Sequence, residues 1–180
     1  MPQRFAATAV AIALAVWSPS MLAAQAAPDL NDAEVADVVL TADNIDIDLA
    51  RLAQTRSKNA EVLKFAGTMI TDHSAVNAKA TALAGKLGVT PENNAVSQSL
   101  LAGARTARAA LEPLQGTAFD EGYIAREVAF HQAVLDALDT LLIPTTSNAE
   151  LKQLLVSVRP AIAAHLAHAQ MLQRSLVAAK

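Results

Sequence analysis

Three histidines and one aspartate interrupt apolar stripes that repeat at alternating steps of four and three residues. In the segment 62–87 every repeating position is apolar except His73, and the segments 124–141 and 151–176 show the same rhythm around His131 and His165. The segment 35–53 shows it around Asp46. This spacing places each stripe on one face of an α-helix. Four predicted helices therefore each carry, near the middle of the buried face, a residue type that can ligate a metal ion.

The chemistry of this set is that of a nitrogen-rich metal site. Glu127 lies four residues before His131 on the same stripe, so it can act as a ligand or as a partner that orients the imidazole. Three imidazoles with one or two carboxylates suit zinc, copper, nickel or a single iron ion. We therefore predict a centre for one transition-metal ion, with the following candidate ligands: His73, His131, His165, Asp46 and Glu127.

A di-iron carboxylate site is not expected. Such a site in a helical bundle takes a Glu-x-x-His motif from each of two helices. The residues three before His73 and His165 are Ile70 and Ile162, so both of these carboxylates are missing. The chain also lacks the glycine-rich phosphate loops, the His-Glu-x-x-His zinc motif and the Gly-x-Ser-x-Gly nucleophile motif.

The same residues fit a purely structural interpretation as well. Buried polar side chains on facing stripes can hydrogen-bond across a bundle and determine which helices pair, with no metal involved. Two neighbouring residues are expected outside the centre. Asp72 is interpreted as a surface residue or a hydrogen-bond partner, and His168 as an exposed residue on the flank of its helix.

The elements that would position these residues are helices joined by short breaks. Asn31 or Asp32 is the expected N-cap of the first helix, Gly88 the stop of the second and Pro144 the stop of the fourth. Pro160 is expected to kink or divide the last helix. We predict helices over residues 31–54, 58–87, 98–112, 118–143 and 148–178.

The four long helices are expected to pair as two antiparallel hairpins. With turns centred near Arg56 and Thr145, His73 would face residue 39, and His131 would face residue 160. The connection over residues 88–117 contains a helix long enough to cross the bundle, which makes the second and third long helices parallel. The five candidate ligands would then lie within about 7 Å of one another along the bundle axis.

Composition supports an all-α fold. The 180 residues are rich in alanine and leucine, and they include six aromatic residues and no cysteine. This composition argues against β-sandwiches, disulfide scaffolds, zinc–thiolate sites, iron–sulfur centres and cysteine nucleophiles. The net charge of −3 gives no basic surface for nucleic acid. We predict one domain over residues 27–180, a four-helix bundle of ferritin-like topology with a short extra helix in the crossover.

The first 26 residues have the pattern of a secretory signal peptide. Arg4 is the only charged residue before Asp29, and an apolar run of 13 residues extends from 5 to 17. This run is shorter than the roughly 18 residues that a membrane span needs, and the small residues of the 24–26 triplet follow it. We expect cleavage after Ala26 and a periplasmic or secreted protein, with an uncleaved amino-terminal anchor as the alternative. No later segment is expected to span a membrane.

Four segments, at residues 46–53, 65–73, 119–132 and 160–166, carry a resemblance to a known family. Over essentially the whole predicted mature region, the chain resembles the domain of unknown function 4142 family of secreted bacterial proteins. The resemblance implies a ferritin-like helical bundle and an exported protein, and it supplies no established activity. This family usually has glutamate at the position of Asp46, so the carboxylate here reaches one methylene less far into the core.

The sequence favours an exported, non-enzymatic helical-bundle protein with a buried His/carboxylate centre for one metal ion. One alternative is a mononuclear metal oxidoreductase that acts on a small oxidant in the periplasm. A second alternative is a structural module that interacts with the cell envelope and uses its buried histidines only for packing. The sequence specifies no substrate, protein partner or oligomeric state.

Overall fold

The computed structural model describes residues 29–178, and this part of the chain is helical with no strand. A π-helical turn (Leu138–Leu142) and the short helix α5 (Ile143–Thr145) extend the fourth helix. The long helices are α1 (Asp32–Arg56), α2 (Ala60–Leu87), α3 (Ala95–Leu111), α4 (Gly116–Ala137) and α6 (Ala149–Ala178). The predicted all-α bundle with an extra helix is confirmed. The predicted signal peptide lies outside the described residues.

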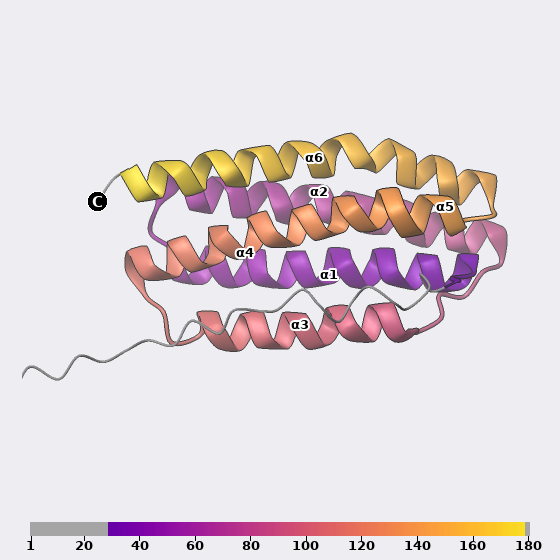
Figure 1. Cartoon of the computed structure of the whole chain (residues 1–180), viewed down its shortest axis with the longest axis horizontal. Coiled ribbons are helices and arrows are strands. Elements are labelled where there is room, and N and C mark those ends of the chain that lie inside the picture. The colour runs from indigo at the N-terminus through magenta and orange to yellow at the C-terminus, as the bar shows by residue number, and fades with distance from the viewer. Residues whose placement is uncertain (1–28, 179–180) are drawn as a thin grey trace, which may run out of the picture.

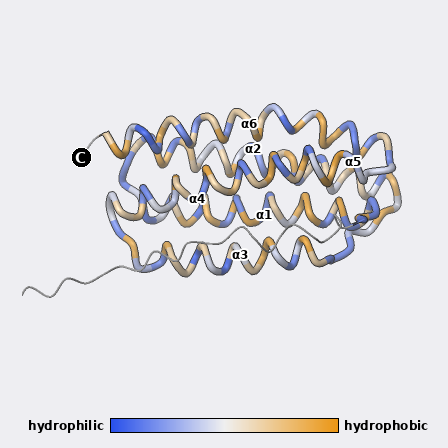
Figure 2. Tube along the Cα trace, in the orientation of Figure 1, coloured by the Kyte–Doolittle hydropathy of each residue, from blue (hydrophilic) through white to orange (hydrophobic). Residues whose placement is uncertain are grey.

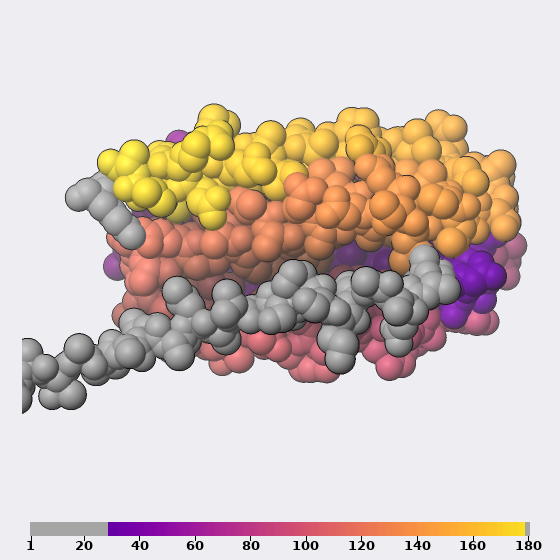
Figure 3. Space-filling view, in the orientation of Figure 1, coloured from indigo at the N-terminus to yellow at the C-terminus, as the bar shows by residue number. Residues whose placement is uncertain are grey.

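The five long helices run roughly along one axis (Figure 1). α1 and α2 form one antiparallel hairpin, and α4 and α6 form the other, packed side by side along the face seen in Figure 3. α3 runs back along the outside of the bundle and contacts α1 and α4. Because of this return, α2 and α4 run in the same direction, as the long crossover predicted.

Asparagine caps determine where four of these helices begin. The side-chain oxygen of each accepts backbone N–H groups of the first helical turn, which have no partner within the helix. The capping residues are Asn31, Asn59, Asn94 and Asn148. α3 begins three residues earlier than predicted because Asn94 supplies its cap. Gly88 ends α2 with a φ of 64°, a left-handed conformation that glycine adopts without strain.

Pro144 does not end its helix where predicted, and Pro160 does not divide α6. Before Pro144 the backbone widens into the π-helical turn, in which the N–H of Ile143 donates to the carbonyl of Leu138, and the chain stays helical to Thr145. Pro144 thus falls in the first turn of α5, where a missing N–H costs no hydrogen bond. α6 continues past Pro160 without division, and Pro160 and Val156, four residues earlier, are both on the solvent side.

A polar layer divides the apolar core into two halves. Apolar and polar residues alternate along every helix (Figure 2), and every position of the predicted stripes is buried or half-buried. One half of the core is built around Phe65, Met69, Phe119, Tyr123 and Leu172. The other half is built around Val35, Val38, Leu138, Leu151 and Leu155. The polar residues of the four stripes lie between these halves.

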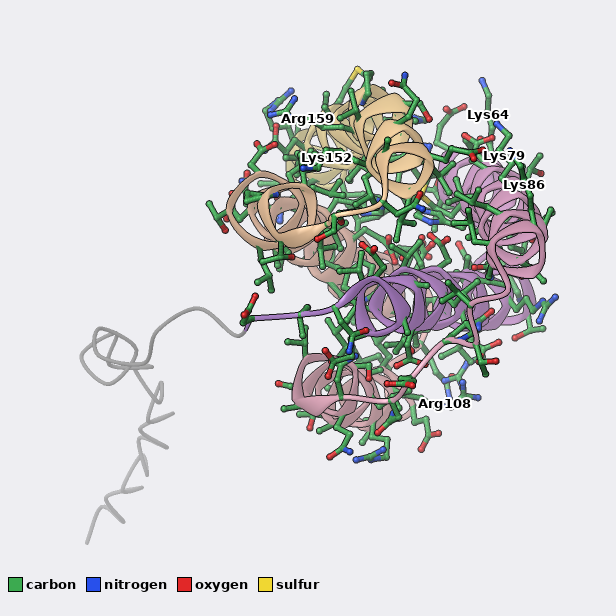
Figure 4. The ribbon with its side chains drawn as sticks, turned by 90° about the vertical axis from the view of Figure 1, so that its right-hand side faces the viewer. Lys64, Lys79, Lys86, Arg108, Lys152 and Arg159 are labelled. Atoms are coloured by element: carbon green, nitrogen blue, oxygen red, sulfur yellow. The ribbon has the colours of Figure 1, made fainter. Side chains whose placement is uncertain are left out.

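Most basic side chains lie on the outside of the bundle. Figure 4 views the molecule along its axis, and the labelled lysine and arginine side chains lie at its periphery. Within residues 29–178, no helix is both long enough and apolar enough to cross a membrane. One arginine, Arg126, departs from this pattern and reaches the polar layer.

Candidate metal centre

Three imidazole rings from three helices meet in the polar layer. The ring centroid of His73 on α2 lies 5.7 Å from that of His131 on α4 and 5.4 Å from that of His165 on α6. The rings of His131 and His165 are also 5.4 Å apart. The three residues are 3%, 0% and 6% exposed, respectively. The structure therefore brings the three histidines together, whereas the sequence placed His73 and His131 at nearly the same depth and His165 about one turn away.

Each imidazole is held through one of its two nitrogens. His73 Nδ1 lies 2.7 Å from Asp43 Oδ1, His131 Nδ1 lies 3.0 Å from the Glu127 carbonyl oxygen, and His165 Nε2 lies 2.9 Å from Asp72 Oδ2. Carboxylate and carbonyl oxygens accept hydrogen bonds, so each of these nitrogens is the donor. The other nitrogen of a neutral ring then carries a lone pair. Ligating histidines in metalloproteins are oriented in this way.

The second nitrogen of each ring has no hydrogen-bond partner. These atoms are His73 Nε2, His131 Nε2 and His165 Nδ1, and all three are buried. One potential ligand atom from each of the three residues lies within 4.8 Å of the others. Buried polar atoms in proteins are nearly always hydrogen-bonded, so three unpaired ring nitrogens in one layer call for an explanation.

The two predicted carboxylates complete the layer. Asp46 and Glu127 are both fully buried, and with His131 they form a second group whose ligand atoms lie within 4.8 Å of one another. Asp46 Oδ2 lies 3.2 Å from His73 Nε2, and Glu127 Oε2 lies 3.4 Å from His131 Nδ1. The structure thus brings together all five residues that the sequence predicted as ligands.

Sequence reasoning missed Asp43, which holds His73, and it also missed Arg126. Its Nη1 donates to Asp46 Oδ1 at 2.6 Å and to Glu127 Oε1 at 2.7 Å. Its guanidinium carbon lies 3.9 Å from the ring centroid of Phe130, a cation–π contact. Position 126 lies beside the stripe, and the only sequence signal was a basic residue next to the buried Glu127.

The charges in the layer follow from burial and from these neighbours. Burial lowers the pKa of His131 to about 4 and also lowers that of His165, so both rings are neutral at pH 7, the state in which imidazole ligates a metal. Burial also opposes a charge on His73, but the hydrogen bond to Asp43 and the charge of Asp46 outweigh it and raise its pKa. His73 is therefore the ring of the three on which a proton competes most strongly with a metal.

The pKa values of the two carboxyl groups shift in opposite directions. Burial opposes ionisation of Asp46, but the positive charge of Arg126 outweighs burial, and the pKa of Asp46 falls below its usual value. Burial and the charge of Asp46 raise the pKa of Glu127 well above its usual value. Asp46 is therefore the carboxylate that carries the negative charge most readily, although both share Arg126. Burial likewise raises the pKa of the nearby Tyr123 hydroxyl.

The register of both hairpins differs from the prediction. His73 faces Asp43 rather than residue 39, because α1 continues to Arg56 and α2 begins only at Ala60, which moves the turn towards α2. His131 lies beside His165 rather than opposite residue 160, because α5 and the loop after it move the second turn beyond Thr145. The first shift brings Asp43 and Asp46 against His73, and the second brings His165 beside His131.

Two residues near the centre, Asp72 and His168, lie outside the set of candidate ligands. Asp72, expected on the surface or as a hydrogen-bond partner, is both: its side chain is 46% exposed and it accepts from His165. His168 is half-buried, with its ring edge-on to Phe65 at 5.2 Å, and not fully exposed as expected. It takes no part in the three-histidine layer.

Comparison with known proteins places this chain in a family. The family model "Domain of unknown function (DUF4142)" matches residues 18–172. The chain belongs to this family. The match begins inside the predicted signal peptide and does not test where that segment ends. No curated protein matches the chain.

A solved structure with a similar fold is titled "CopM in the Cu(II)-bound form". It shares 15% sequence identity with this chain, with a TM-score of 0.62, over 81% of this chain and 97% of that one. At this identity the likeness concerns the fold.

Proposed function

We propose that this DUF4142 protein is an exported metal-binding protein that holds one divalent transition-metal ion between His73, His131 and His165. The observation that carries the proposal is the set of three buried ring nitrogens, one from each histidine, that have no hydrogen-bond partner. Asp46 and Glu127 lie against these rings and supply a negative charge beside the bound cation.

A purely structural role explains these nitrogens less well. Histidines that only specify helix packing would gain from hydrogen bonds across the core, and each buried polar atom left unpaired costs about 1–3 kcal/mol. Here every ring is oriented through one nitrogen while the other nitrogen makes no hydrogen bond, although His73 Nε2 lies 3.2 Å from Asp46 Oδ2. A metal ion would satisfy all three unpaired nitrogens at once.

The donor set favours copper(II) or zinc. Neutral imidazoles suit both ions, and among the divalent first-row metals copper(II) binds most tightly to a given nitrogen site. The similar fold whose title describes a copper(II)-bound form makes copper the first ion to test. We propose binding rather than catalysis because each of the three histidines is less than a tenth exposed, which leaves little room for a substrate at the metal.

Export is part of the proposal and rests on the amino-terminal pattern. A positive residue at position 4, a short apolar run and a small-residue triplet ending at Ala26 are typical of a cleaved signal peptide. The protein would meet metal ions in the periplasm or outside the cell.

The test is the metal content of protein purified without an affinity tag and dialysed against buffered copper(II). We expect one ion per chain for the wild-type protein and for the control His168→Gln, whose histidine lies outside the layer. We expect no stoichiometric binding for His131→Leu, which removes a central ligand. Absence of stoichiometric binding by the wild-type protein for copper(II) and zinc would contradict the proposal, as would undiminished binding by His131→Leu.

A further inference from the structure

The centre contains two groups of potential ligands, and they share a residue. His73, His131 and His165 form one group, and Asp46, Glu127 and His131 form the other. The first group consists of nitrogen atoms, whereas the second is rich in carboxylate oxygen. Two such groups side by side in one bundle would offer room for two cations.

A cation already lies on the carboxylate group. A single nitrogen of Arg126, Nη1, bridges Asp46 Oδ1 at 2.6 Å and Glu127 Oε1 at 2.7 Å. The Arg126 side chain is only 11% exposed, and its guanidinium stacks on Phe130, which restricts its movement. Because arginine stays protonated in proteins, this positive charge is permanent.

The carboxylates keep acceptor capacity that Arg126 does not use. Asp46 Oδ2 and Glu127 Oε2 are buried and make no hydrogen bond, although Asp46 Oδ2 lies 3.2 Å from His73 Nε2 and Glu127 Oε2 lies 3.4 Å from His131 Nδ1. A purely structural network would be expected to hydrogen-bond both oxygens of each carboxyl group, because unpaired polar atoms in the interior are costly. Each carboxyl group thus accepts a hydrogen bond from Arg126 through one oxygen, while its other oxygen makes no hydrogen bond.

We infer that the carboxyl groups of Asp46 and Glu127, beside His131, form a second cation site in which the guanidinium of Arg126 is the resident cation, so that the centre takes one metal ion instead of two. On this inference Arg126 sets the stoichiometry of the centre: without it, the carboxylate group takes up a second divalent ion. The inference rests on the proposed function for the first ion, but the second site stands on its own contacts.

The test compares zinc bound per chain, by dialysis against buffered zinc chloride and elemental analysis, across four tag-free proteins. We expect one ion for the wild-type protein and for Arg126→Lys, which keeps a positive charge. We expect two for Arg126→Leu. The triple variant Arg126→Leu/Asp46→Asn/Glu127→Gln, which has no carboxylates for a second ion, should return to one.

Three results would overturn the inference. The first is equal zinc content in folded Arg126→Leu and in the triple variant, and the second is two zinc ions per chain in Arg126→Lys. The third applies if Arg126→Leu unfolds without metal while the triple variant folds. In that case, failure of zinc to restore the helical circular dichroism of Arg126→Leu would overturn the inference. A wild-type protein that binds no zinc or copper would instead contradict the proposed function. The second site would still be judged from the difference between Arg126→Leu and the triple variant.

Discussion

The three histidines differ in how firmly their hydrogen-bond acceptors are held. Asp43 is buried, and the Glu127 carbonyl belongs to the backbone of α4, so neither can be removed without disturbing the core. Asp72 is different because nearly half of its side chain is exposed. It orients His165 from the solvent side, where water can replace it.

Asp72→Ala should therefore weaken metal binding while leaving the fold intact. Loss of a carboxylate that orients a ligating histidine typically lowers metal affinity about 10–100-fold. The free energy of unfolding of the metal-free protein should change by less than about 1 kcal/mol, since a surface side chain is removed.

Competition titration with a chelator of known affinity measures this effect. Asp48→Ala is the matched control, because Asp48 is an exposed aspartate whose partner, Arg51, is also exposed. Equal affinities for the two variants would show that Asp72 does not orient a ligand.

Residue types on the stripes were readable from the sequence, whereas Arg126 was not. The histidines, Asp46 and Glu127 stand out because each is polar at an otherwise apolar position. Arg126 lies beside the stripe, where a basic residue is normally exposed. Its burial depends on Phe130 one turn later and on Asp46 of another helix, so only the three-dimensional packing reveals it.

At the scale of elements, the caps and turns determine the register on which the centre depends. Helix types and most boundaries could be predicted from periodicity, but a turn of a few residues moves a facing helix by as many positions. This is why His73 faces Asp43 and not residue 39. The π-helical turn before Pro144 was also unpredictable from periodicity, because it depends on how the backbone accommodates a missing N–H.

The start of α3 provides a prediction at this scale. Asn94 caps α3 through the N–H groups of Val96 and Ser97, and its side-chain nitrogen also donates to the Glu34 carbonyl of α1 at 3.1 Å. Asn94→Ala should therefore cost about 2 kcal/mol of unfolding free energy, a cap and a buried hydrogen bond together.

Urea denaturation checks this value against Asn59→Ala. Asn59 caps α2 with Glu61 and Val62, so its loss should cost only about 1 kcal/mol. If Asn94→Ala lowers the free energy of unfolding by no more than the control does, the contact between α3 and α1 does not contribute to stability.

At the scale of the whole molecule, the polar layer interrupts a core that is otherwise apolar from end to end. The composition and the long crossover were enough to predict the bundle and the parallel α2 and α4. Residue types alone predicted a metal centre but left a purely structural layer open, because the sequence does not show which atoms remain unpaired.

Metal binding should stabilise the entire fold, since the ligands come from three helices that are together only in the folded state. At a free copper(II) concentration 100 times the Kd, the gain is about 2.7 kcal/mol, which raises the Tm by roughly 5–10 °C for a domain of this size. Chelator should reverse the shift. His168→Gln should keep the shift and His131→Leu should lose it, as thermal denaturation followed by circular dichroism would reveal. An equal shift in both variants would place the metal elsewhere.

The most direct test of the central claim is anomalous diffraction from crystals of the copper(II)-loaded protein at the copper absorption edge. We predict one peak in the polar layer, within bonding distance of His73 Nε2, His131 Nε2 and His165 Nδ1. Absence of a peak there in copper-loaded crystals, or a peak only on surface side chains, would contradict the account.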